Sequence, residues 1–387
     1  MAITQYDSGT MFIPIPSGTP CPICGGRDGR CSEFYLNHEL LYISCKHVTS
    51  NEPSGLSGWY KHRVDGSTIR GKELKTIPDI KKYELTDEVQ ELRHRVYTDL
   101  MAMIREYISS GLYEEDREDL TRRGLEDVEI SRMGLSSVPK SNHRVWSDKG
   151  NFQIQLMTHI NRRLYAKHGN DLLKVPGFMK IRGNNGDFIT LKTKMKRPGE
   201  DKLSDIRGYF VPYKNYKGQM VGMQYRLSVP LLDEKGKPIR YFWLSSKSAP
   251  SGSPIDVYVP SNLKRDDVLL VGEGALKMKI ASEWTGYTAA SEAGVNNYNA
   301  LAEEIQRLEI KNNKKYKIIL ALDMDKYENI QDSNGKKLHP ILDAEKKTIE
   351  LLKLTNHKIA VAEWISDAGK GIDDALLNGA KLYYRLV

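Results

Sequence analysis

Two apolar stretches in the last third of the chain each end in acidic residues. Val268–Gly274 has the sequence VLLVGEG, and Ile318–Asp325 has the sequence IILALDMD. Short apolar runs separated by helix-like segments indicate parallel strands of an α/β sheet. Because ligands bind beyond the carboxyl ends of such strands, we expect Glu273, Asp323 and Asp325 to converge at one edge of the sheet. Three carboxylates suit Mg²⁺, which carboxylates and phosphate oxygens usually hold together, so the sequence predicts metal-dependent phosphoryl chemistry.

The residues around these two stretches alternate between strand-like and helix-like segments. This alternation predicts an α/β domain over residues 266–387, built on a parallel four-stranded sheet. The expected strands lie near 268–272, 286–290, 316–322 and 358–364.

The composition limits the class of protein. A chain of 387 residues can form two or three domains, and 40% of its residues are hydrophobic while 28% are charged. No apolar run is long enough to span a membrane, and the first residues lack the features of a signal peptide, so we expect a cytoplasmic protein without membrane association. The net charge of +8 favours a polyanionic partner, but only weakly, because many basic proteins bind no nucleic acid.

All four cysteines lie close together near the N-terminus. Cys21 and Cys24 form a Cys-x-x-Cys pair, which Cys31 and Cys45 follow. In a cytosolic chain such clustering indicates a zinc site rather than a disulfide framework. Four thiolates complete tetrahedral coordination, so the Zn²⁺ would be structural. His47 in place of Cys31 is a rival fourth ligand, and two structural thiols beside two incidental ones are a further alternative.

The part of the chain before the α/β domain divides into three regions. Residues 1–62 form the zinc module, in which a strand is expected at 40–44. Residues 63–85 are Lys-rich and weakly periodic, which is typical of a linker. An apolar stripe at three-to-four spacing predicts a helix over 86–108. This helix opens the third region, 86–265, which is rich in strands from about residue 145.

Several segments resemble one enzyme family. The order of a glutamate and then Asp-x-Asp in one α/β unit resembles a Toprim domain, which bacterial primases, topoisomerases and some nucleases share. Leu120–Leu125 (LTRRGL) resembles the segment that opens the catalytic core of DnaG-type bacterial primases. Gly208–Arg226 resembles their basic subdomain, and Arg240–Ser246 (RYFWLSS) resembles their Lys-Tyr-x-x-Ser strand. An N-terminal zinc ribbon completes the same domain order, with a cysteine spacing closer to the primases of phages and mobile elements.

This resemblance implies an α+β multidomain fold and a DNA primase function. Such an enzyme synthesises short RNA primers on single-stranded DNA from NTPs, here for a phage, plasmid or integrated element. Glu273, Asp323 and Asp325 would be the catalytic residues and would hold Mg²⁺ or Mn²⁺, with Asp373 as a further candidate ligand. The sequence contains no Gly-x-x-x-x-Gly-Lys-Ser/Thr P-loop, so the resemblance implies a separately encoded helicase or other replication proteins as partners.

Basic residues before the α/β domain are candidates for contacts with the NTP or the template. The family match assigns such contacts to Arg226, Arg240 and Lys247. A solvated strand arginine is the alternative for Arg226. The run at 192–197 (KTKMKR) is a candidate basic patch, although charge runs are more often solvated faces.

The chain departs from the family pattern at three places. Lys277 stands where family primases often carry an acidic residue, and a polar insertion follows Asp325. The final Asp motif of the family is matched only approximately, by Gly371–Asp374. The number of metal ions and their exact ligands therefore stay open. Asp367 is an alternative to Asp373, because an acid at a helix start is also a routine N-cap.

Two other functions are alternatives to a primase. One is a Toprim-type nuclease, which would use the same metal ions with water as the nucleophile. The zinc ribbon and the basic subdomain count against it. The other is a non-catalytic nucleic-acid-binding regulator, and the intact set of Glu and Asp-x-Asp carboxylates counts against that function.

Overall fold

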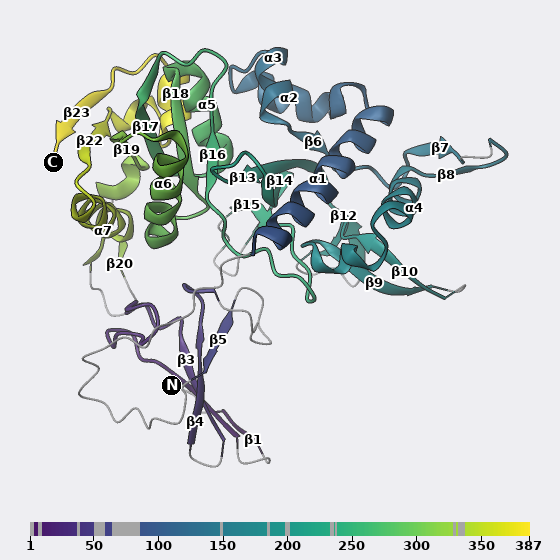
Figure 1. The fold of residues 1–387 in the computed structure, drawn as a ribbon, viewed down its shortest axis with the longest axis horizontal. Coiled ribbons are helices and arrows are strands. Elements are labelled where there is room, and N and C mark those ends of the chain that lie inside the picture. The colour runs from purple at the N-terminus through teal and green to yellow at the C-terminus, as the bar shows by residue number, and fades with distance from the viewer. Residues whose placement is uncertain are drawn as a thin grey trace. The chain divides into compact units, whose positions relative to one another are not determined.

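Figure 1 shows the computed structural model of the chain. It divides into two units, Met1–Asp87 and Glu88–Val387, which are described separately below. Most of the expected linker lies outside the described residues. The structure describes residues 4–6, 10–36, 39–49, 59–63, 86–147, 150–183, 186–197, 202–232, 236, 238–327, 330–331 and 337–387.

The first unit contains an antiparallel five-stranded sheet in the order β1-β2-β3-β4-β5. Its core is small, because three of the five buried apolar residues in its cluster are cysteines and the others are Ile15 and Ile43. So small a core usually needs a disulfide or a metal to be stable. The strands are β1 (Thr4–Tyr6), β2 (Thr10–Pro14), β3 (Ser32–Leu36), β4 (Glu39–Cys45) and β5 (Tyr60–Arg63).

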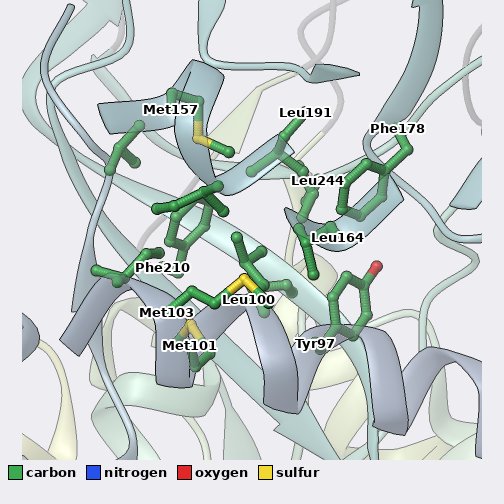
Figure 2. Close-up of a cluster of buried hydrophobic side chains, with 14 of the residues drawn as sticks. Tyr97, Leu100, Met101, Met103, Met157, Leu164, Phe178, Leu191, Phe210 and Leu244 are labelled. Atoms are coloured by element: carbon green, nitrogen blue, oxygen red, sulfur yellow. The ribbon is translucent and has the colours of Figure 1, made fainter. Parts of the chain in front are cut away.

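The second unit begins with the expected long helix, α1 (Asp87–Tyr107). Its apolar stripe packs against an antiparallel four-stranded sheet in the order β15-β14-β13-β6. Figure 2 shows Tyr97, Leu100 and Met103 of α1 in one cluster with Phe210 of the sheet. The strands are β6 (Ser136–Ser137), β13 (Gly208–Lys214), β14 (Met220–Leu232) and β15 (Pro238–Trp243).

Short helices and three two-stranded hairpins surround this sheet (Figure 1). The helices are η1 (Ser109–Gly111), α2 (Glu114–Arg122), α3 (Asp127–Met133), α4 (Leu156–His168) and η2 (Gly169–Lys174). The hairpin strands are β7 (Arg144–Trp146) with β8 (Gln153–Gln155), β9 (Phe178–Gly183) with β10 (Gly186–Leu191), and β11 (Lys194–Lys196) with β12 (Leu203–Asp205).

A second sheet follows, with six strands in the order β16-β18-β17-β19-β22-β23. The four central strands are parallel, and antiparallel β16 and β23 flank them, so the sheet has two more strands than expected. One of the added strands, β16, precedes residue 266. The strands are β16 (Asp256–Tyr258), β17 (Arg265–Glu273), β18 (Tyr287–Glu292), β19 (Lys317–Ala321), β22 (Lys358–Glu363) and β23 (Tyr383–Leu386).

Helices cover both faces of this sheet, which explains why its central strands are continuously apolar. Leu269 and Val271 of β17 belong to the core beneath α6 and α7, whereas Leu270 belongs to the core beneath α5 and α8. The helices are α5 (Ala275–Thr285), α6 (Tyr298–Asn312), η3 (Met324–Tyr327), α7 (Pro340–Leu354), η4 (Ser366–Ala368) and α8 (Ile372–Leu377), and a small hairpin joins β20 (Ile330–Gln331) to β21 (Lys337–Leu338).

Helix α5 also joins the two sheets of the second unit. Leu276 and Ile280 of α5 share a buried cluster with Tyr209 and Val211 of β13 and with residues of α2 and α3. Polar contacts reinforce this packing, because Asp256 accepts the backbone N–H of Lys214 at 2.8 Å and pairs with Lys279 of α5. The position of β14 relative to the carboxyl ends of β17 and β19 is therefore set by a common core.

The buried ion pair between Lys279 and Asp256 gives a test of this joint. Both side chains are almost fully buried, at 0% and 1% exposure. Removal of one partner leaves an uncompensated buried charge, so Asp256→Ala should lower the free energy of unfolding by about 3–5 kcal/mol. Denaturant unfolding measures the effect. Asp266→Ala, which breaks an exposed pair with Lys314, is the control and should change little. Equal effects of the two substitutions would contradict the structural role of the buried pair.

Candidate functional site

The four cysteines of the first unit gather into one cluster. Their sulfur atoms all lie within 4.8 Å of one another. The Sγ atoms of Cys24 and Cys31 are 3.8 Å apart, and those of Cys31 and Cys45 are 3.6 Å apart. A tetrahedral zinc ion with Zn–S bonds of about 2.3 Å places its sulfurs about 3.8 Å apart. The cluster is therefore compatible with Zn²⁺ bound by four thiolates.

Backbone amides next to the cluster point at its sulfur atoms. The N–H groups of Ile23, Gly26 and His47 donate to the sulfurs of Cys21, Cys24 and Cys45 at 3.3–3.4 Å. Such donors stabilise thiolate charge and orient the ligands of a metal. This pattern is compatible with a metal-binding knuckle.

His47 lies near the cluster but has a different partner. Its Nε2 is 2.8 Å from Oδ2 of Asp28. The sulfur of Cys31, in contrast, is within the group of four. The geometry therefore favours Cys31 over His47 as the fourth ligand.

The carboxylates expected in the second unit meet at one edge of the six-stranded sheet. Glu273 is the last residue of β17, Asp323 follows the adjacent parallel strand β19, and Asp325 lies in η3. Burial raises the pKa of Glu273, and the negative charges of Asp323 and Asp325 raise it further. Asp373, in the first turn of α8, is 7% exposed, and burial raises its pKa as well.

Two lysines lie among these carboxylates. The Nζ of Lys277 contacts Oδ1 of Asp323. The Nζ of Lys370 is 2.6 Å from Oδ2 of Asp325 and 3.6 Å from Oδ2 of Asp323. In the described part of the chain, the cysteines are the group that is gathered tightly enough to hold a metal without rearrangement. At the sheet edge, ammonium groups occupy positions that a metal ion would need.

The donor set nevertheless fits a divalent cation. Among the described residues, Oδ1 of Asp325 and Oδ1 of Asp373 are buried and have no hydrogen-bond partner. An unsatisfied buried carboxylate oxygen costs free energy, and a cation at these atoms would recover it. Carboxylate oxygens are the ligands that Mg²⁺ and Mn²⁺ prefer.

Glu292 is a residue of this edge that the sequence analysis did not single out. It ends β18, beside Glu273 in the parallel register, and is 1% exposed. Burial raises its pKa to about 8, although the N–H of Asn297 donates to it at 2.7 Å. The raised pKa favours the neutral form of Glu292. Glu292 comes two residues after the strand expected near 286–290, so the rule that parallel strands end at one edge could have identified it.

Arg226 is placed differently from both expectations for it. It is 3% exposed, so it is not a solvated strand arginine, and its burial also keeps it from direct contact with a template or nucleotide. Its guanidinium lies over the ring of Tyr241, at 5.5 Å from the ring centre, and 3.7 Å from Asp119. Arg240 and Lys247 are exposed, and so are Lys194 and Lys196 of the candidate basic patch.

A row of alternating charges connects Arg226 to the carboxylates. Asp119 of α2 lies between Arg226 and Arg123, and it is 3.5 Å from Nε of Arg123. The Nη1 of Arg123 is in turn 3.6 Å from Asp373. Arg123 belongs to the LTRRGL segment, but sequence reasoning did not identify it as a site residue. The turn after it requires Gly124, because φ is +78° and a Cβ there would be 2.7 Å from Trp284.

Comparisons with known proteins identify a partial family match. The family described as "Domain of unknown function (DUF3854)" matches residues 263–382, which contain the carboxylate edge. No curated protein sequence matches the chain. No helix in the described ranges is both long enough and apolar enough to cross a membrane.

Solved structures similar to this chain include domains of DnaG-type primases. A DnaG primase catalytic domain bound to single-stranded DNA is 14% identical, with a TM-score of 0.40, over 76% of this chain and 79% of that chain. The RNA polymerase domain of Mycobacterium tuberculosis primase DnaG is 17% identical, with a TM-score of 0.40, over 74% and 79%. The zinc-binding and RNA polymerase domains of Aquifex aeolicus primase are 14% identical, with a TM-score of 0.39, over 75% and 62%. At these values the function has to be argued from the residues of this chain.

The ligand assignment at the cysteine cluster is directly testable. We expect one zinc ion per purified chain, measured by elemental analysis. Cys31→Ser should lose most of that zinc and unfold the first unit, because a tetrahedral site with three thiolates is open and weaker. His47→Ala is the matched control and should keep the ion. Retention of zinc by Cys31→Ser together with its loss from His47→Ala would show that the ligand set is wrong.

Proposed function

We propose that this protein is a DNA primase, which synthesises short RNA primers on single-stranded DNA by metal-dependent nucleotidyl transfer. The observation that carries the proposal is that Glu273 and Asp323 lie at the carboxyl ends of adjacent parallel strands, and that Oδ1 of Asp325 and Oδ1 of Asp373 are buried without a hydrogen-bond partner. The order of Glu273 and then Asp323-x-Asp325 resembles that of a Toprim domain, which supports the proposal. We propose replication of a phage, plasmid or integrated element as the setting, in the cytoplasm.

The carboxylates supply what this chemistry needs most. Phosphoryl transfer depends mainly on positioning and on neutralisation of charge. A Mg²⁺ or Mn²⁺ ion held by Glu273, Asp323 and Asp325, with Asp373 as a further ligand, would bind the triphosphate and activate the 3′-hydroxyl. Lys370 is 56% exposed and can turn from Asp325 towards a phosphate oxygen. Burial raises the pKa of Glu292 to about 8, which favours its neutral form beside Glu273.

The surface next to β15 is the proposed template and nucleotide contact. Arg240 and Lys247 are exposed, and Tyr241 between them is 38% exposed. Exposed positive side chains and an exposed aromatic ring in one segment of the chain suit single-stranded nucleic acid, whose phosphates pair with charges while its bases stack on rings. We therefore propose that Arg226 is a positioning residue. Its guanidinium contacts the ring of Tyr241 and the carboxylate of Asp119 and so holds both side chains in place.

The first unit offers a second surface of the same chemistry. Phe34 and Tyr42 stack at 4.5 Å on its sheet, and the ammonium of Lys61 lies 4.9 Å from the ring centre of Tyr42. We propose that this zinc-stabilised sheet contacts template bases and helps to select the start site. We propose a separately encoded helicase or other replication proteins as the partners that would supply the motor function.

A metal-dependent nuclease is the second candidate, because the same carboxylates can activate water as the nucleophile. The aromatic and basic side chains that are exposed on the second unit and partly exposed on the first favour the primase, since a templated reaction must hold an extended single strand. An assay that records both incorporation and cleavage distinguishes the two activities.

Substitution of the carboxylates tests the proposed activity. Asp323→Asn and Asp325→Asn should each reduce primer synthesis at least about 100-fold, because they remove electrostatic stabilisation at the reacting phosphates. The measurement is incorporation of labelled NTPs on single-stranded DNA with Mg²⁺ or Mn²⁺, with products sized on a gel. Asp343→Asn, at an exposed position in α7, is the control and should remain active. Full synthesis by an Asp323/Asp325 double variant would refute the site, and DNA cleavage without incorporation would establish the nuclease.

Substitution of the basic residues should separate those that bind single-stranded DNA from the one that stabilises the fold. Affinity for single-stranded DNA should fall steeply with salt, and Arg240→Ala with Lys247→Ala should weaken it and lower the salt slope by about one per residue that contacts phosphate. Arg226→Ala should instead lower the free energy of unfolding by about 1–3 kcal/mol, because buried partners lose their donor. Fluorescence anisotropy and thermal unfolding separate the effects. Equal loss of stability in all three variants would contradict this division.

A further inference from the structure

Lys277 lies in the first turn of α5, directly after the strand end that carries Glu273. The N-terminus of a helix favours negative charge, so a lysine there is unfavourable unless other groups compensate. The first turn of α5 contains no acidic residue. The compensation for Lys277 must therefore come from the carboxylates that surround it.

Lys277 is held firmly among those carboxylates. Its Nζ contacts Oδ1 of Asp323, and its side chain is only 20% exposed. The contact with the carboxylate of Asp323 accounts for an ammonium group at this largely covered position. Lys277 is thus a charged group in spite of its burial.

Close packing keeps the side chain in place. A Cβ added at Gly371 would be 3.1 Å from Cε of Lys277 and 2.6 Å from Oδ1 of Asp373. The lysine stem and the unpaired, buried oxygen of Asp373 therefore border the same backbone position. The absence of a side chain at Gly371 thus leaves room for the lysine beside Asp373.

Lys370 differs from Lys277 in its exposure and in its place in the chain. It is 56% exposed, and it reaches the site from the segment between η4 and α8. Its contacts are with Oδ2 of Asp325 at 2.6 Å and Oδ2 of Asp323 at 3.6 Å. An exposed ion pair contributes little free energy, so Lys370 can leave at small cost.

We propose that Lys277 is a built-in cation of the carboxylate site that limits it to one divalent metal ion, and that Lys370 is the group which this ion displaces. The inference rests on the proposed metal-dependent function. Asp323, Asp325, Glu273 and Asp373 provide four carboxylates, of which Lys277 permanently neutralises one. One divalent ion then leaves the set with a single net negative charge. A second ion would give the set a net positive charge and would lie against the ammonium of Lys277, where repulsion in a buried site is strong.

The test is a count of bound Mn²⁺ on the zinc-loaded full chain, from the electron paramagnetic resonance signal of free Mn²⁺. The parent protein should bind one ion that Asp325→Asn removes. Lys277→Asp should bind two, because it exchanges the resident cation for a ligand. Lys277→Arg keeps the charge and should bind one. Lys370→Gln should still bind one ion, about tenfold more tightly, and Lys353→Gln at an exposed position in α7 should match the parent protein.

The outcomes separate this inference from the function on which it rests. A parent protein with no Mn²⁺ site sensitive to Asp325→Asn would overturn both. If the parent protein and Lys277→Asp each bind one Mn²⁺ ion with the same affinity at the site that Asp325→Asn removes, that result would overturn the inference while the metal-dependent function stands. Two such ions in the parent protein would also overturn the inference alone. Circular dichroism on each variant shows whether it is folded. If Lys277→Asp is not folded, Lys277→Arg keeps the comparison of Mn²⁺ binding valid.

Discussion

The parallel pairing of β17 with β18 on one side and β19 on the other is the constraint from which the site follows. Parallel strands end at the same edge, so this register brings Glu273, Glu292 and the Asp323–Asp325 turn together. The strands can pair in this way because α5, α6 and α7 bury both faces of the sheet. The apolar core thus supplies the free energy that holds several carboxylates in one place despite their repulsion.

Charge compensation is the second requirement, and the chain meets it with its own side chains. Lys277 and Lys370 pair with Asp323 and Asp325, and Arg123 approaches Asp373. Arg123 and Arg226 both pair with Asp119, so the charged row crosses from the six-stranded sheet to the four-stranded one. Helices α5 and α2 share a buried cluster with β13. A displacement of the side chains at one end of this charged row should therefore alter the positions of those at the other end. This physical link joins the surface around Tyr241 to the carboxylates.

Much of this arrangement could be predicted from the sequence, because it depends on local patterns. Apolar runs that end in acids located Glu273 and Asp323, and the cysteine spacing located the cluster in the first unit. Other features depend on contacts between distant segments, which no local pattern encodes. The burial of Arg226 depends on Tyr241 and Asp119. The edge strands β16 and β23 are short and flank the parallel core, so their pairing was not visible in the alternation of strands and helices. The pairing of Lys277 with Asp323 likewise arises only when α5 and β19 pack together.

The central claim is that these carboxylates serve templated nucleotide transfer. The most direct measurement is incorporation of each of four labelled NTPs on homopolymer single-stranded DNA, with and without Mn²⁺ or Mg²⁺. The account predicts that only the complementary NTP is incorporated, and only when the divalent ion is present. Incorporation that ignores the template, or cleavage of the DNA without incorporation of any nucleotide, would contradict it.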